Sequence, residues 1–197
     1  MKFQIASRKN VFRYSLYPHK EKAILISATD KYSPPAKILQ LPNYNGIVAT
    51  KRVKFDDVAL GKPNCITPDD AMEIAEFVKS HDIANYDTII VHCEVGICRS
   101  AGICAAIMNY LGEDYKQIFK SKTFKPNIGC YKLVCEAFGI IQSEKELKEL
   151  QELNHKVWQS RSKKETTAFA LHAIKSTTIP HIIRQTNILI TEKFFHD

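Results

Sequence analysis

Cys93 and Arg99 are the residues of this chain whose types and spacing most clearly suggest chemistry. Five residues separate them. The apolar run 88–91 precedes this segment and a second apolar stretch follows it, so we expect a buried strand, a loop and a helix. A thiolate is a good nucleophile, and a helix N-terminus with a nearby cation lowers the pKa of a cysteine enough to form one. The pattern therefore predicts attack by Cys93 on a phosphate monoester.

The residues between this pair are suited to holding the phosphate. Backbone N–H groups at a helix N-terminus bind phosphate oxygens, and Arg99 offers a planar fork for two of them. A buried cysteine can also be a small hydrophobic residue, and an arginine at a helix start can be solvated. The joint occurrence of strand, cysteine, glycine, arginine and apolar helix favours the phosphate loop. The predicted loop residues are Glu94, Val95, Gly96, which permits a tight turn, Ile97 and Cys98.

The same segment carries a family resemblance. His92-Cys93, five further residues and Arg99-Ser100 form a His-Cys-x5-Arg-Ser pattern that resembles the signature of cysteine-dependent protein phosphatases. The resemblance implies that Ser100 donates a hydrogen bond to the Cys93 sulfur and assists its departure. It also implies that His92 orients the loop and helps to hold the thiolate, and does not act as a base.

Size and flanking sequence favour the dual-specificity branch of that family. Lys125-Pro126-Asn127 resembles the Pro-Asn helix start that follows the catalytic helix in dual-specificity phosphatases. The resemblance covers roughly residues 22–141 and is weaker toward the N-terminal end.

The leaving oxygen of a phosphoester needs a proton, so a general acid is expected before the cysteine. Asp57 follows a predicted strand and lies 36 positions upstream of Cys93, a spacing similar to that of dual-specificity relatives. Asp56 is the alternative, and strand geometry would point it to the opposite side. Either aspartate can also be a simple turn former.

Cys98 has two interpretations. Gly96-Ile97-Cys98-Arg99-Ser100 resembles the loop of low-molecular-weight tyrosine phosphatases, in which a second cysteine can bridge to the nucleophile. That resemblance implies a reversible, protective Cys93–Cys98 disulfide. A packing role is the alternative, and it is the favoured one.

Composition narrows the class of protein. The chain has 197 residues, of which 45% are hydrophobic and 25% charged, and a net charge of +7. We expect no membrane span, no secretion and a cytoplasmic location, because no apolar run is long enough and the N-terminus lacks a hydrophobic signal core. The six cysteines show no metal-ligand spacing, so no metal or cofactor is expected. The basic charge suits an anionic phosphosubstrate or simply a soluble surface, and no dense Lys/Arg run indicates nucleic acid.

Predicted strands alternate with predicted helices, which indicates an α/β fold: a mostly parallel central sheet flanked by helices, phosphatase-like, with an appended C-terminal helical segment. We expect a catalytic domain over 1–141 and a C-terminal extension over 142–197, with an amphipathic helix to about 162 and an unassigned remainder. The expected strands are 23–27, 47–50 with 53–55, and 88–91, and the expected helices are 68–81, 99–111, 114–119, 127–140 and 143–162.

Together these features favour a phosphatase that acts through a cysteinyl-phosphate intermediate on phosphotyrosine in proteins, with phosphoserine and phosphothreonine also admitted. Three alternatives stay open. A phosphoinositide phosphatase would be expected to carry basic residues in the loop, whereas this loop has Glu94, Val95 and Ile97, which argue against that function. An RNA 5′-phosphatase is compatible with the basic charge. A non-enzymatic phosphoprotein-binding module usually loses the cysteine or the arginine, and both are present.

Overall fold

The computed structural model describes the backbone of residues 1–39 and 41–176 and, apart from Pro42, the side chains up to residue 160. The chain forms two compact units, Met1–Gln159 and Ser160–Asp197. All the candidate residues named above belong to the first unit. In the second, the structure describes the helical backbone up to Ser176 and the side chain of Ser160 alone.

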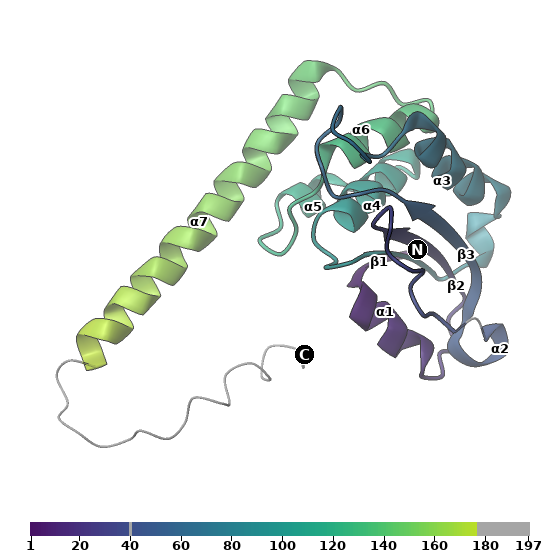
Figure 1. The fold of residues 1–197 in the computed structure, drawn as a ribbon, viewed down its shortest axis with the longest axis horizontal. Coiled ribbons are helices and arrows are strands. Elements are labelled where there is room, and N and C mark those ends of the chain that lie inside the picture. The colour runs from purple at the N-terminus through teal and green to yellow at the C-terminus, as the bar shows by residue number, and fades with distance from the viewer. Residues whose placement is uncertain (40, 177–197) are drawn as a thin grey trace. The chain divides into compact units, whose positions relative to one another are not determined.

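Four parallel strands form the sheet of the first unit (Figure 1). They are β1 (Lys2–Ser7), β2 (Ala23–Thr29), β3 (Ile47–Lys54) and β4 (Thr88–Cys93), in the spatial order β1-β4-β2-β3. The two central strands, β2 and β4, are buried along their whole length, which explains their continuous apolar sequences. The predicted α/β fold with a parallel sheet flanked by helices is confirmed.

Alternate residues of the central strands face different layers, as the strand period of two requires. In β2, Ile24 and Ile26 join the larger core, whereas Leu25 joins a smaller core on the opposite face. The larger core is closed by α3 (Pro68–Ser80), α4 (Arg99–Tyr110) and α6 (Ile128–Ala137), and the smaller one by α1 (Arg8–Ser15) and the segment 36–38 (Figure 1).

The helix starts follow local sequence signals. Thr67 caps α3 by accepting from Asp70 N, and the Asp70 carboxylate accepts from Thr67 N in return. Asn127 caps α6 through Cys130 N. α4 is buried on every side over its first ten residues, as its run of small and apolar side chains predicts.

Several elements differ from the predicted ones. β1, α1 and the short α2 (Pro42–Asn45) are absent from the prediction, as is a 3-10 turn at Ile83–Asn85. The two predicted pieces around residue 50 form the single strand β3. α5 (Lys116–Phe119) begins later than predicted, and α7 (Glu144–Ser176) continues beyond residue 162.

The first turns of α7 pack on the sheet unit. Leu147 and Leu150 belong to the larger core, and Asn154 and Trp158 donate to the Phe124 carbonyl at 3.1 and 2.6 Å. The appended helix thus covers its own chain. The domain boundary at 141 stays a prediction, and the part of the extension at 177–197 lies outside the described residues.

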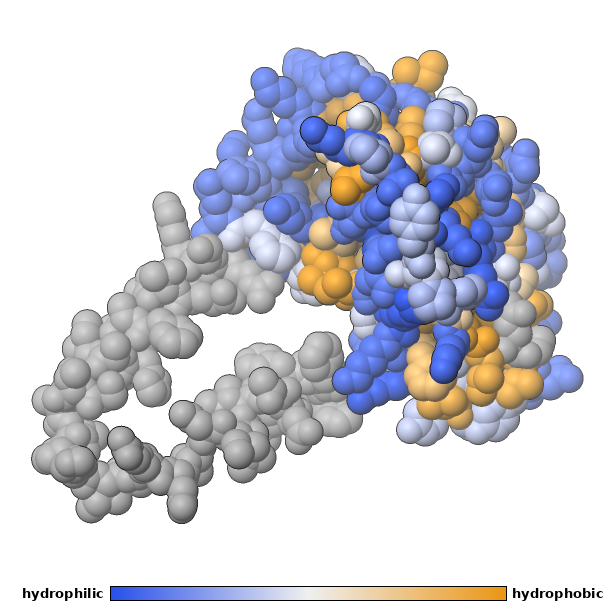
Figure 2. Space-filling model, viewed as in Figure 1, coloured by the Kyte–Doolittle hydropathy of each residue, from blue (hydrophilic) through white to orange (hydrophobic). Residues whose placement is uncertain are grey.

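The surface of the first unit mixes hydrophilic and hydrophobic areas. Figure 2 shows hydrophobic surface at its lower edge, where α1 and α2 lie in Figure 1, and Phe12, Leu16 and Leu41 are exposed in these segments. Within the described ranges, no helix is long and apolar enough to cross a membrane.

Candidate active site

The carboxyl ends of the four parallel strands lie along one edge of the sheet, where ligand sites of such sheets form. Ser7 at the end of β1 pairs in register with Cys93 at the end of β4, and β2 and β3 end nearby at Thr29 and Lys54. The segments that leave these strands therefore meet around Cys93, although they are far apart in sequence.

The loop after Cys93 turns its carbonyl groups outward and its N–H groups inward. The outward bonds join Glu94 O to Arg8 N (3.2 Å), Ile97 O to Lys125 N (3.1 Å) and Cys98 O to Asn127 N (3.0 Å). The N–H groups of Gly96, Ile97 and Ser100 are directed at the Cys93 sulfur instead. The concave side of the loop is therefore lined by donors, the arrangement expected of an anion site.

The Cys93 sulfur lies at the centre of these donors and is only 2% exposed as a residue. The Ser100 hydroxyl is 3.2 Å away, and Gly96 N is also at 3.2 Å. Burial is the largest single influence on the pKa of Cys93 and raises it, but the hydrogen bonds from Ser100, Gly96 and Ile97 together outweigh burial. The pKa of Cys93 is thereby lowered, which favours a thiolate.

Gly96 makes the close approach of β1 and α1 to the loop possible. It adopts φ +78°, and a Cβ there would lie 2.6 Å from Ala6 C and from Ser7 N. The loop therefore packs directly against the chain where β1 passes into α1.

Arg99 is buried and held on two sides. One terminal nitrogen donates to Phe55 O at 2.6 Å, and the other pairs with Asp30 Oδ1, also at 2.6 Å. Its Nε is buried and has no hydrogen-bond partner among the described residues. A buried donor of this kind, beside inward N–H groups, fits the equatorial oxygens of a phosphate.

His92 is fully buried and forms a pair with Ser27, its register partner in β2. His92 Nε2 lies 2.7 Å from Ser27 Oγ, and Nδ1 lies 3.3 Å from Cys93 O. Burial lowers the pKa of His92 to about 4, so the ring is neutral. Because a carbonyl only accepts, Nδ1 carries the proton and donates to Cys93 O, and Nε2 accepts from Ser27. His92 thus contacts the backbone at residue 93.

The two candidate acids point in different directions. Asp56 accepts from Lys31 N at 2.9 Å and from Asn64 Nδ2 at 3.1 Å, and the bond from Lys31 N is the main cause that lowers the pKa of Asp56. Asp56 is therefore held as a carboxylate that ties two loops together. Asp57 is exposed and accepts from Asn127 Nδ2 at 2.9 Å.

Asn127 links the segment of the candidate acid Asp57 to the predicted phosphate loop. Its Nδ2 donates to both Asp57 and the Val58 carbonyl, while its backbone N–H donates to Cys98 O in the loop. A Cβ on Gly102 would lie only 2.4 Å from Asn127 O, so α4 must carry a glycine where this segment crosses it. Asp57 is thus positioned against the loop by one residue that contacts both.

Cys98 is oriented toward Asp57. The pKa of Cys98 is raised to about 12, first by burial and then by the charge of Asp57 and a hydrogen bond from the thiol to Asp57. A protonated thiol is a weak nucleophile, so this environment does not favour attack by Cys98 on an oxidised Cys93. The Cys93–Cys98 disulfide stays a prediction.

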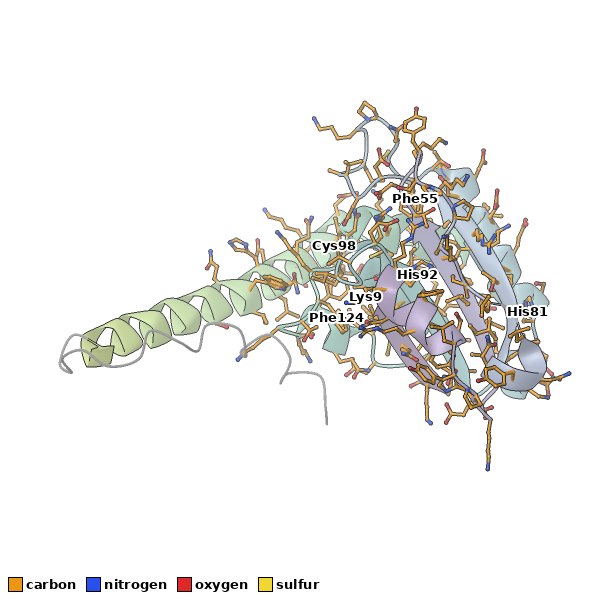
Figure 3. All side chains as sticks on the ribbon, turned by 60° about the horizontal axis from the view of Figure 1, so that its bottom comes forward. Lys9, Phe55, His81, His92, Cys98 and Phe124 are labelled. Atoms are coloured by element: carbon orange, nitrogen blue, oxygen red, sulfur yellow. The ribbon has the colours of Figure 1, made fainter. Side chains whose placement is uncertain are left out.

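All of the sequence-predicted site residues gather at this edge, and Figure 3 shows His92 and Cys98 in the same region as Phe55. Asp30, Asn127 as a partner of Asp57, Ser27 and Arg8 were not predicted as site residues. Their positions after strands could have indicated them. Asp30 directly follows β2 and Arg8 directly follows β1, and both strands are neighbours of β4 in the sheet.

No protein-family model and no curated protein matches the sequence. The chain is structurally similar, at low identity, to solved dual-specificity phosphatases. A mouse candidate dual-specificity phosphatase complexed with zinc tungstate is 12% identical with a TM-score of 0.41, over 81% of this chain and 86% of that one. Human DUSP28 is 13% identical with a TM-score of 0.38, over 81% and 94%. PTPMT1 in complex with PI(5)P is 14% identical with a TM-score of 0.37, over 82% and 94%.

Proposed function

We propose that this chain is a phosphatase that hydrolyses phosphate monoesters through a cysteinyl-phosphate intermediate. One observation carries the proposal: the buried Cys93 sulfur, with its lowered pKa, lies within a ring of inward N–H groups, and the buried Arg99 begins the helix that follows this loop. A structural cysteine has no need of such donors, because burial alone would keep it a thiol.

In the first step, the Cys93 thiolate attacks phosphorus in line with the leaving oxygen. The S–P bond forms as the P–O bond to the leaving group breaks, and Asp57 gives its proton to that oxygen. The equatorial oxygens receive hydrogen bonds from the loop N–H groups and from Arg99, whose orientation is fixed by Phe55 O and Asp30.

In the second step, Asp57 is a carboxylate and takes a proton from the attacking water. The water oxygen bonds to phosphorus, the S–P bond breaks and the sulfur leaves as a thiolate. Ser100 Oγ, 3.2 Å from the sulfur, donates to that developing charge. The enzyme returns to its starting protonation state, and no metal or cofactor takes part in either step.

Phosphotyrosine in proteins is the substrate that we favour. Val95 is 66% exposed at the loop, so apolar surface is available there for an aromatic ring. All six cysteines are free, which suits a reducing compartment such as the cytoplasm.

The test is a hydrolysis assay with p-nitrophenyl phosphate, phosphotyrosine, phosphoserine and phosphothreonine peptides, a phosphoinositide and 5′-phosphorylated RNA. We expect release of phosphate from the aryl phosphate and the phosphotyrosine peptides, and none by the Cys93→Ser variant. Turnover by Cys93→Ser at a rate near that of the wild type would refute the covalent mechanism. Preference for RNA or the lipid would refute the substrate class.

A further inference from the structure

A pocket of about 430 Å³ opens beside the phosphate loop. Its walls come from α1, from the segment 34–37 and from Glu94, the residue that follows Cys93. Ser7, the last residue of β1, pairs in register with Cys93, and α1 begins at the next residue, Arg8. The start of α1 therefore lies close to the nucleophile. A substrate that presents its phosphate to the loop would therefore place adjoining groups at this pocket.

Arg8 holds the pocket together. Its guanidinium lies 2.9 Å from Glu94 Oε1 and donates to the carbonyl groups of Pro34 at 2.8 Å and Pro35 at 3.0 Å. One side chain thus fixes the 34–35 segment against the loop. The charge of Arg8 is offset by Glu94, the only acidic residue in the lining.

Two other cations of the pocket have no such partner. Lys9, labelled on α1 in Figure 3, and Lys37 are both exposed, and neither forms an ion pair with any side chain that the structure describes. Phe12, Pro34 and Pro35 supply the apolar part of the lining. The pocket therefore combines apolar surface with two positive charges that no described ion pair compensates.

We infer that this pocket is a specificity subsite that binds an acidic side chain of the phosphoprotein substrate, close in sequence to the phosphorylated residue. The inference rests on the proposed function. A glutamate or aspartate matches the pocket because it carries one negative charge on an apolar stem. A second phosphate matches it less well: the one arginine fork is already engaged, and the Glu94 carboxylate would repel a dianion more strongly.

The test compares two phosphotyrosine peptides that differ only in flanking glutamates replaced by glutamines, and measures the ratio of their kcat/KM values. Wild type should favour the acidic peptide about fivefold, the size expected of two exposed charge pairs, and added salt should reduce the preference. Lys9→Gln/Lys37→Gln should bring the ratio close to one, and Lys9→Glu/Lys37→Glu should favour the neutral peptide. Lys148→Glu/Lys156→Glu on α7 changes the net charge by as much as Lys9→Glu/Lys37→Glu does, but away from the pocket. It should keep the wild-type ratio.

Three results would overturn the inference. The first is a wild-type ratio of one, and the second is an unchanged ratio in Lys9→Glu/Lys37→Glu with the thermal midpoint intact. The third is a loss of hydrolytic activity in Lys9→Glu/Lys37→Glu that affects only a phosphoinositide in vesicles. This result would assign the pocket to a lipid headgroup. Absence of wild-type hydrolysis of every phosphopeptide and of p-nitrophenyl phosphate would instead refute the proposed function itself.

Discussion

At the scale of single residues, Asp56 and Asp57 are the two candidates for the proton donor, and their contacts distinguish them. Asp56 is engaged by Lys31 N and Asn64, which favour its ionised form. Asp57 faces the loop through Asn127 and Cys98. A general acid must reach the leaving oxygen beside the loop, so the position of Asp57 against the loop favours Asp57 over Asp56.

Asp57→Asn should lower kcat for phosphopeptides by about 10²–10³-fold, the usual contribution of a general acid. The loss should be smaller for aryl phosphates with very good leaving groups, because their oxygen needs less protonation. The basic limb of the pH–rate profile should flatten as well. Asp56→Asn serves as the neighbouring control. If Asp56→Asn shows this pattern and Asp57→Asn does not, the acid is misassigned by one residue.

His92 should make the fold sensitive to acid. Its pKa is about 4 in the folded chain, below the ordinary 6.5, so the unfolded chain binds more protons between these values and stability falls as pH drops through that window. We expect wild type to lose roughly 2–3 kcal/mol more than His92→Gln between pH 7 and pH 4.5, measured by urea unfolding. Equal losses in the two proteins would show that His92 ionises freely in the fold.

At the scale of elements, the site depends on how closely β1 and α1 approach the phosphate loop. Gly96 is the point of contact, since its Cβ position is occupied by backbone of Ala6 and Ser7. Gly112 provides a matched comparison: it has almost the same φ, +77° against +78°, but no atom beyond its neighbours in the chain lies within 4 Å of its Cβ position.

Gly112→Ala should cost about 1–2 kcal/mol of unfolding free energy, the strain of a left-handed backbone alone. Gly96→Ala should cost at least about 1–3 kcal/mol more, because backbone must move to admit the methyl group. Gly96→Ala should also lose most activity, whereas Gly112→Ala keeps it. Equal destabilisation, measured by chemical denaturation, would mean that the loop and β1 separate easily.

The elements that hold the loop could be predicted because their signals are local. An apolar run predicts β4, Thr67-Pro68 predicts the start of α3, and small apolar residues predict a central α4. β1 was missed because it is a short edge strand in which only Ala6 is buried. Two contacts were missed, that of Asp30 with Arg99 and that of Asn127 with Asp57. The first depends on the order of the strands in the sheet and the second on how two loops pack, and neither can be derived from a single sequence.

At the scale of the whole molecule, the first part of α7 contributes to the core of the first unit. Leu150→Ala should destabilise the first unit by about 2–5 kcal/mol, as deletion of a buried leucine does, with Leu147→Ala behaving similarly. Lys148→Ala, on an exposed position between them, should change stability by less than about 0.5 kcal/mol. Thermal and chemical unfolding of the full chain provide the measurement. If neither leucine variant is destabilised, the first part of α7 does not contribute to the core of the first unit.

In the proposed mechanism, Cys93 carries the phosphoryl group during turnover. The most direct test is to mix the Asp57→Asn variant with an aryl phosphate that has a very good leaving group, so that the intermediate forms and its hydrolysis is slowed. After quenching with denaturant, peptide mapping by mass spectrometry should find one phosphoryl group on the peptide that contains Cys93, and none in a Cys93→Ser/Asp57→Asn protein. A burst of released phenol with the phosphoryl group on another residue, or with none bound, would contradict the account.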